Sequence, residues 1–166
     1  FKILDTYLKN ASTGTDYLLY QEPLGPVSGI HTQLPVLLSE YSFYDTQDVE
    51  TYLALLKETP SYFDSIIRFE QKKAASGLFM PDYQADSVLD TCQSFIDMGK
   101  ENYLVSTFDE RIASLDLLPE NKKDSFRKEN MKLVTEEIYP AYQNLITAIK
   151  SLKGKGTNEQ GLSHFP

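Results

Sequence analysis

The chain has 166 residues, of which 41% are apolar, so it is about one globular domain in length and too apolar to be an intrinsically disordered segment. Its 24 acidic and 16 basic side chains leave a formal net charge of −8, which argues against nucleic acid or an anionic membrane as a partner, because both select faces rich in Lys and Arg. The single cysteine excludes an internal disulfide and a zinc site built on paired thiolates, and no apolar run approaches the ~18–20 residues that span a bilayer.

The first part of the chain, residues 1–44, is predicted to be irregular, with short helices. Residues 1–10 carry apolar side chains at helical spacing. Two prolines and two glycines then fall within seven residues beginning at Pro23, a density that no regular helix tolerates. We therefore expect extended or irregular chain up to Pro35, which is suited to open a short helix over residues 36–40.

Residues 45–153 are predicted to form a helical bundle. Asp45 or Thr46 is suited to cap a helix whose apolar positions repeat at helical spacing. The pair Thr59-Pro60 is typical of a helix start, with a hydroxyl cap followed by proline at the first position. The first helix is therefore expected to end there and a second to begin at once. Two helices joined with almost no loop must turn sharply or pack antiparallel.

Three further helices are predicted in the rest of the bundle. One opens at Asp82, one spans roughly residues 101–115, and the longest begins at Glu120. Pro140 lies inside the longest helix and should kink it, because proline removes a backbone hydrogen bond. Beyond the irregular N-terminal segment no strand pattern occurs. The predicted fold is all-α, a multi-helix bundle with antiparallel helices, followed by a flexible tail over residues 154–166 that leads into further sequence.

Sequence motifs for catalysis or metal binding do not emerge. A zinc peptidase motif needs two histidines on one helix face, whereas His31 and His164 are far apart in the chain. Neither a Gly-x-Ser-x-Gly nucleophile turn nor a glycine-rich phosphate loop is present. Cys92 shares its helix face with Leu89 and Phe95, so we expect a buried, inert thiol rather than a nucleophile. We therefore predict no metal, no cofactor and no catalytic residue in this chain.

Ser28, His31 and Gln33 are the candidate ligand-lining side chains. They lie in the segment rich in glycine and proline, where non-helical backbone is able to line a pocket. The alternative is that His31 is an exposed or hydrogen-bonded loop histidine that binds no ligand.

The aromatic content suggests a second kind of contact. Eleven Tyr and nine Phe side chains exceed what one slim bundle needs to bury. In one alternative, some of these rings meet another surface, either a second copy in a homo-oligomer or further sequence of the same protein. In the other, all of them fill a single core. The sequence leaves both alternatives open.

Motifs in a fixed order link this chain to a known family. Residues 23–35, with the sequence PLGPVSGIHTQLP, open the series. The later matches are Tyr41, Phe43, Tyr52, Leu53, Leu56, Pro60, Phe63, residues 77–81, Tyr139, Pro140, Ala141, Tyr142, Gly161, Leu162, Phe165 and Pro166. From about Tyr17 to its end, the chain therefore resembles a bacterial family known as domain of unknown function 885.

That family is mostly helical and similar to thermolysin-like zinc metallopeptidases, and its members are far longer than this chain. Their proposed metal motif lies far downstream of the matched region, so the resemblance assigns no metal ligand here and implies zinc only in the downstream part. It implies that this chain is a non-catalytic N-terminal portion of a zinc-dependent peptidase-like hydrolase. These helices would wall a substrate cleft lined by residues 28–33, with the rest of the parent chain and a peptide substrate as partners.

A free-standing helical module that docks a protein or peptide against its aromatic faces is the alternative function. A self-contained enzyme that uses carboxylates and tyrosines is disfavoured, because their spacing does not bring such groups together. Many relatives carry export or lipoprotein signals, so the resemblance implies a cell-envelope or extracellular location, although no signal is visible in the chain itself.

Overall fold

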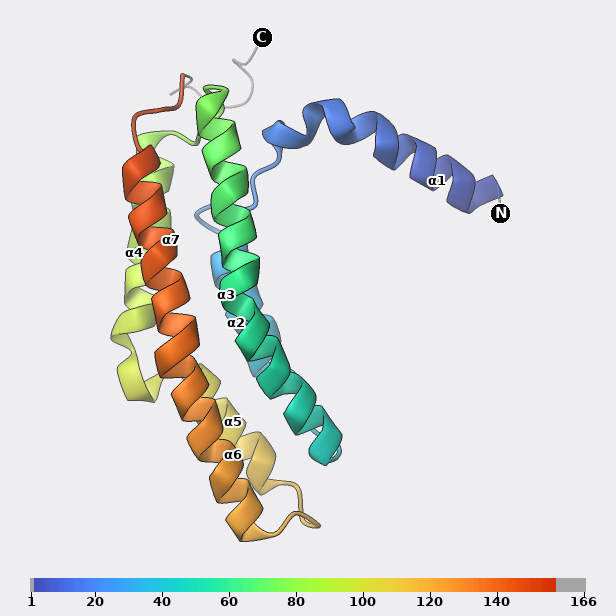
Figure 1. Cartoon of the computed structure of the whole chain (residues 1–166), viewed down its shortest axis with the longest axis vertical. Coiled ribbons are helices and arrows are strands. Elements are labelled where there is room, and N and C mark those ends of the chain that lie inside the picture. The colour runs from blue at the N-terminus through green and yellow to red at the C-terminus, as the bar shows by residue number, and fades with distance from the viewer. Residues whose placement is uncertain (1, 158–166) are drawn as a thin grey trace.

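The computed structural model describes residues 2–157, and no strand occurs among them. The prediction of an all-α fold is therefore confirmed (Figure 1). Within the same range no helix combines the length and the hydropathy needed to cross a bilayer. In chain order the elements are α1 (Lys2–Thr13), the 3-10 helix η1 (Gly14–Tyr20), α2 (Ile30–Ser39), α3 (Thr46–Ala75), α4 (Asp82–Asp97), the 3-10 turn η2 (Gly99–Glu101), α5 (Tyr103–Ala113), α6 (Glu120–Leu133), the π-helical turn η3 (Val134–Ile138) and α7 (Tyr139–Leu152).

Two long helical rods form the frame of the bundle. One is α3, and the other is the continuous run of α6, η3 and α7. The two rods run in the same direction and pack together, while α2, α4 and α5 run the opposite way beside them (Figure 1). α4 packs on α7, and α5 packs on both α6 and α2. α1 projects away from the bundle, and η1 connects it to the region of α3 (Figure 1).

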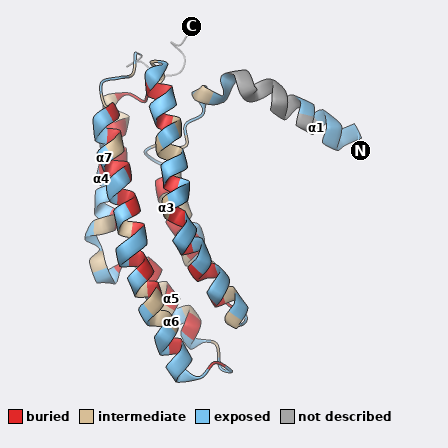
Figure 2. Cartoon of the chain, viewed as in Figure 1, coloured by how far each residue is buried: buried red, intermediate tan, exposed pale blue. Residues whose placement is uncertain are grey.

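Aromatic rings fill much of the space between the helices. Tyr142 of α7 stacks on Phe95 of α4 with ring centroids 4.3 Å apart, and it meets Phe63 of α3 edge-on at 5.0 Å. Toward the other end of the bundle, the rings of Tyr52 and Phe108 lie 5.5 Å apart. The buried faces of the helices turn toward one another (Figure 2). Because such ring pairs add ~0.5–1.5 kcal/mol beyond the area they bury, much of the aromatic content stabilises the core.

Several helices begin or end where local residues predicted. The Asp45 carboxylate accepts a hydrogen bond from the Asp48 N–H at 3.1 Å, and the Asp48 carboxylate accepts one from the Asp45 N–H at 3.3 Å. This reciprocal pair is a capping box at the start of α3. α4 begins at Asp82 and α6 begins at Glu120, as expected. Gly77 follows the end of α3 with a φ of 73°, a conformation that favours glycine.

The prediction that irregular chain runs up to Pro35 is wrong. α2 begins at Ile30, so Pro35 lies inside the helix. Proline has no N–H to donate to the carbonyl four residues back, which is that of His31. This carbonyl instead accepts a hydrogen bond from the hydroxyl of Tyr142 on α7, at 2.5 Å. A partner from a distant part of the chain thus replaces the lost helical bond, which explains why the helix includes the proline.

The predicted break at Thr59-Pro60 is also wrong, because α3 is continuous across it. The Thr59 hydroxyl donates to the carbonyl of Leu55 at 3.0 Å, one turn back, and does not cap a new helix. Leu56 before the proline and Phe63 after it are both buried. Burial of one face along the whole helix therefore outweighs the ~3 kcal/mol that a proline costs in a helix interior.

A π-helical turn stands directly before Pro140 in the second rod. The N–H of Tyr139 donates to the carbonyl of Val134, five residues back, rather than to the carbonyl four residues back. Pro140 has no N–H to donate, and the hydrogen-bond pattern changes in the turn just before it. The helical rod continues through Pro140 into α7. The kink expected at Pro140 stays a prediction.

The beginning of the predicted tail makes contacts with the bundle. The Gly154 N–H donates to the Asp82 carboxylate at 2.8 Å, and the Thr157 N–H donates to the Gly77 carbonyl at 3.0 Å. Residues 158–166, which include the second histidine and the last motif of the family resemblance, lie outside the described residues.

Candidate functional site

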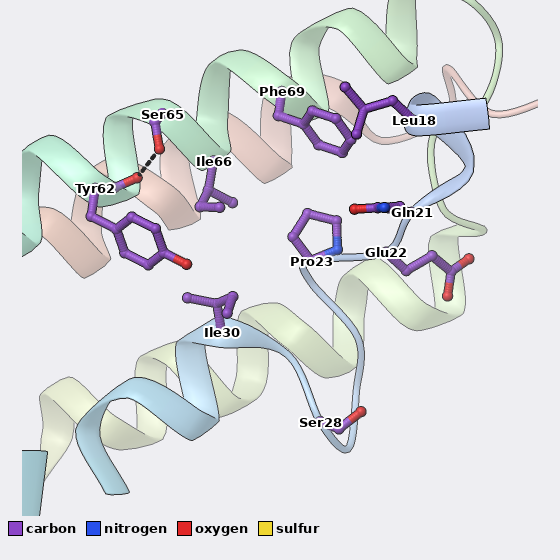
Figure 3. Close-up of a pocket in the computed structure, with 10 residues that line it drawn as sticks. All are labelled: Leu18, Gln21, Glu22, Pro23, Ser28, Ile30, Tyr62, Ser65, Ile66 and Phe69. Atoms are coloured by element: carbon purple, nitrogen blue, oxygen red, sulfur yellow. Dashed lines mark hydrogen bonds between the residues drawn. The ribbon is translucent and has the colours of Figure 1, made fainter. Parts of the chain in front are cut away.

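A pocket of about 700 Å³ lies between α3 and the segment that leads from η1 into α2 (Figure 3). We term it the N-terminal pocket. It is the larger of two neighbouring hollows on this side of α3. Its lining residues are Leu18, Gln21, Glu22, Pro23, Ser28, Ile30, Tyr62, Ser65, Ile66 and Phe69.

Hydrogen bonds to two backbone carbonyls hold the lining segment in place beside α3. The ammonium of Lys73 on α3 donates to the carbonyl of Gln21 at 2.8 Å. The Ile30 N–H at the start of α2 donates to the carbonyl of Pro23, also at 2.8 Å, and closes the loop between them. The stretch rich in glycine and proline therefore folds as a tight loop, and Ser28 lies at its far end (Figure 3).

A buried ion pair lies behind this attachment. Lys73 and Glu70 are 2% and 1% exposed, and the Lys73 Nζ lies 3.8 Å from a carboxylate oxygen of Glu70. Neither oxygen of Glu70 has a hydrogen-bond partner among the described residues. Burial raises the pKa of the Glu70 carboxyl to about 7, the Lys73 ammonium opposes this rise, and the Glu22 carboxylate adds to it. The pair is thus sensitive to pH near neutrality.

The pocket combines an apolar lining with polar residues, among which Glu22 is the one charged residue of the described lining. Leu18 and Phe69 lie together at one end, and the ring of Tyr62 lies opposite Ile30 with its hydroxyl turned into the pocket (Figure 3). The Gln21 side chain also extends into this space (Figure 3). No Lys, Arg or His is among the described lining residues. Such a surface is able to hold an apolar group and to exchange hydrogen bonds beside it.

The structure separates the three side chains predicted to line a ligand site. Ser28 is exposed and lines the N-terminal pocket. His31 lies in the first turn of α2 and is only 2% exposed, and neither ring nitrogen has a hydrogen-bond partner among the described residues. Burial lowers the pKa of the His31 imidazole to about 4, so the ring is neutral at neutral pH. Gln33 is exposed on α2, outside the lining of this pocket.

Sequence reasoning missed the side of the pocket that α3 provides. Tyr62, Ile66 and Phe69 line it from successive turns of that helix. Their spacing of four and three residues is a helical repeat, and it adds a second apolar stripe beside the buried face of α3. That stripe is a signal in the sequence, but helical spacing alone does not show that the segment around Gln21 packs beside it.

A second, more apolar hollow of about 260 Å³ continues along α2 and α3. We term it the leucine groove. Tyr62 lines both hollows, so they are neighbours on one surface. The residues of the groove are Leu34, Leu37, Leu38, Tyr41, Leu55, Glu58, Thr59 and Tyr62.

The described residues offer neither a cluster of metal ligands nor an exposed thiol. Among those residues no group of three His, Cys, Asp or Glu side chains is placed to share a metal ion. Cys92 is buried in α4, and burial raises the pKa of its thiol to about 12. The described residues therefore do not fit a zinc site.

Comparison with known proteins finds one matching family and a similar solved structure. A family model described as "Bacterial protein of unknown function (DUF885)" matches residues 1–164. No curated protein matches the sequence. The fold is similar to a solved structure described as "the putative lipoprotein from Colwellia psychrerythraea", with a TM-score of 0.82 at 19% identity. The match covers 87% of this chain but only 25% of that one, so this chain spans about a quarter of its length.

Proposed function

The chain belongs to the DUF885 family of bacterial proteins of unknown function, and on this premise we propose that it is a helical, non-catalytic N-terminal part of a larger peptidase-like hydrolase. The observation that carries the proposal is that the same fold forms about a quarter of a much longer chain. The resemblance of the family to thermolysin-like zinc metallopeptidases supplies the reaction class. Zinc would be held by downstream residues, and no chemical step is assigned to the residues described here.

In the larger protein this chain would contribute to the wall of the substrate cleft. The N-terminal pocket and the leucine groove adjoin at Tyr62 and together form a strip along α2 and α3. Apolar side chains of a peptide fit such hollows, and the hydroxyl of Tyr62 is available to its amide groups. The lipoprotein description of the structural relative supports a cell-envelope location for the larger protein.

The test uses the full-length gene product and a panel of peptides. We expect peptide hydrolysis that is lost when a chelator removes zinc and is restored when zinc is added. Ser65 is exposed and lines the N-terminal pocket, so Ser65→Trp should obstruct it with little effect on folding. Loss of the contacts to one apolar side chain should raise KM by about 10-fold while kcat changes little.

The matched control is Ser94→Trp, on the exposed side of α4, which should leave KM unchanged. Absence of peptide hydrolysis would contradict the assigned reaction class. An unchanged KM in Ser65→Trp would contradict the role of this surface as a cleft wall.

A free-standing binding module is the second candidate, and the leucine groove favours it. Leu37, Leu55 and Tyr62 are 64%, 43% and 42% exposed along the groove, which is the form of surface that accepts an amphipathic helix. The gene separates the two candidates. A reading frame that ends near Pro166 supports the module, and several hundred further codons with paired histidines support the larger hydrolase.

A further inference from the structure

We propose that the arm formed by α1 and η1, residues 2–20, packs against the remainder of the larger polypeptide through its exposed apolar side chains. The existence of that remainder rests on the proposed function. The choice of the arm as the contact rests on the structure of this chain.

The arm presents apolar side chains that the bundle does not cover. α1 packs on η1 and extends away from the other helices (Figure 1). Ile3 and Leu4 on α1 are 88% and 58% exposed, and Tyr17 on η1 is 68% exposed. Figure 2 shows the outer end of α1 as exposed. Both ends of the arm therefore carry large apolar side chains in contact with water.

α1 is too short to be stable without a packing partner. Helices shorter than about 12–15 residues are marginal in water, because the first turn is costly to form and most helical stability comes from packing of an apolar face. α1 has 12 residues. Apolar side chains recur at helical spacing in its sequence, at Ile3, Leu4, Tyr7 and Leu8. Such a helix is expected to be stabilised by a partner on its apolar side.

The distribution of charge favours an apolar contact at the arm. Residues 2–20 contain two lysines and two aspartates, so their formal charge is zero and the net charge of −8 lies in the rest of the chain. The cores of protein interfaces are depleted of charged residues, because a charge loses its hydration there. The neutral, apolar arm meets this condition, whereas two complete copies of the chain repel each other through their equal net charges.

The length of polypeptide outside this fold identifies the partner. The match covers 25% of the solved lipoprotein chain, so about three quarters of that chain lies outside it. A segment of the same polypeptide is held near the arm at an effective concentration on the order of 1 mM when the linker is short, well above the concentration of a second copy in dilute solution. Contact within one polypeptide therefore outcompetes association of two copies.

This contact would also position one wall of the N-terminal pocket. Leu18 of η1 lines the pocket, and its neighbour Tyr17 is exposed on the arm. On the other side of η1 the chain is attached to α3 by the hydrogen bond from Lys73 to the Gln21 carbonyl. A partner that holds the arm therefore fixes η1 from both sides.

Hydrogen exchange on the full-length gene product tests the contact. In the 166-residue chain the amides of α1 should exchange rapidly, because this helix projects from the bundle. In the full-length protein they should exchange at least about tenfold more slowly, and this protection should not depend on protein concentration. The amides of α7, which lies within the bundle, are the internal reference and should be equally protected in both proteins.

Two variants of the full-length protein locate the contact. Ile3→Glu places a charge in the proposed interface and should restore rapid exchange of α1. A glutamate in the first turn is favourable to an isolated helix, so the lost protection reports the contact rather than a weaker helix. The control Leu117→Glu, at a fully exposed position between α5 and α6, should leave the exchange of α1 unchanged.

Three results would overturn the proposal. They are rapid exchange of α1 in the full-length protein, protection that survives Ile3→Glu, and protection that rises with protein concentration. The last result would assign the arm to a second copy of the chain.

This contact and the proposed function fail separately. Protected α1 without peptide hydrolysis by the full-length protein would contradict the hydrolase and support the contact. Hydrolysis with an unprotected α1 would support the hydrolase and contradict the contact. A reading frame that ends near Pro166 would contradict both.

Discussion

The hydroxyl of Tyr142 donates a hydrogen bond to the backbone carbonyl of His31, 2.5 Å away, and thereby attaches α7 to the first turn of α2. Ile30 in the same turn lines the N-terminal pocket. The carbonyl is free to accept this bond because Pro35, four residues on, has no N–H to donate to it. One bond between distant residues thus joins the frame of the bundle to a wall of the candidate site.

Replacing Tyr142 by phenylalanine tests this attachment. Tyr142→Phe keeps the ring that stacks on Phe95 but leaves the buried His31 carbonyl without its partner. We expect the free energy of unfolding to fall by about 1–3 kcal/mol, measured by urea denaturation. Tyr83→Phe, at an exposed position of α4, is the control and should change little.

A second variant tests whether the hydrogen bond from Tyr142 replaces the helical bond that Pro35 cannot form. Pro35→Ala restores an N–H that is able to donate to the His31 carbonyl within the helix. In that background Tyr142→Phe should cost less than in the natural sequence, and the difference is the coupling energy of a double-mutant cycle. Equal costs in both backgrounds would show that the carbonyl is not what links the two residues.

Arg111 on α5 holds the C-terminal end of α2. Its guanidinium donates to the carbonyls of Leu38 and Tyr41, at 3.0 and 2.5 Å. It also lies over the ring of Phe43, 4.5 Å from the centroid. Lysine keeps the charge but cannot donate in this planar arrangement, so Arg111→Lys should lower the free energy of unfolding by about 1–3 kcal/mol.

The matched control is Arg68→Lys, at an exposed position of α3, which should shift the free energy of unfolding by less than about 0.5 kcal/mol. Thermal denaturation of the two variants side by side measures the contrast. An equal decrease in the free energy of unfolding in both variants would mean that the contacts of Arg111 with α2 do not stabilise the fold.

The buried His31 makes stability depend on pH on the acid side. Its pKa is lowered from 6.5 to about 4, so between these values the unfolded chain binds more protons than the folded one. The contribution of His31 to the free energy of unfolding is therefore fully present above about pH 6.5. It is lost as the pH falls toward 4, and the total loss is about 3 kcal/mol. His31→Leu should remove this rising contribution, so that the unfolding free energy falls with pH between about pH 4.5 and 6.5, where the opposite contribution of Glu70 then remains. An unchanged slope would contradict the neutral, buried imidazole.

Glu70 contributes a dependence of the opposite sign. Its pKa is raised from 4.5 to about 7, so between these values the folded chain binds more protons than the unfolded one. This contribution is present below about pH 4.5 and is lost as the pH rises toward 7. Glu70→Gln should remove it, so that stability rises more steeply with pH between about 4.5 and 6.5, where His31 alone then acts. Glu137→Gln, at an exposed position, should reproduce the natural slope.

Local features of the sequence determined the helical class and several helix boundaries. Asp45 caps α3 through the N–H of a residue three positions on, and such an interaction needs no other part of the chain. The same holds for the starts of α4 and α6, where proline precedes an acidic first turn. The order of short motifs also indicated the family that the family model then matched.

Only the tertiary structure decided which helices continue through a proline and where the pocket forms. Pro35 lies inside α2 because Tyr142 takes up the carbonyl that it leaves free, and Pro60 lies inside α3 because residues on both sides of it are buried on one face. The N-terminal pocket likewise arises where the segment around Gln21 is held against α3 by Lys73. In each case the deciding energy comes from contacts between residues that are far apart in the chain, whereas spacing in the sequence reports only on neighbours within a turn or two.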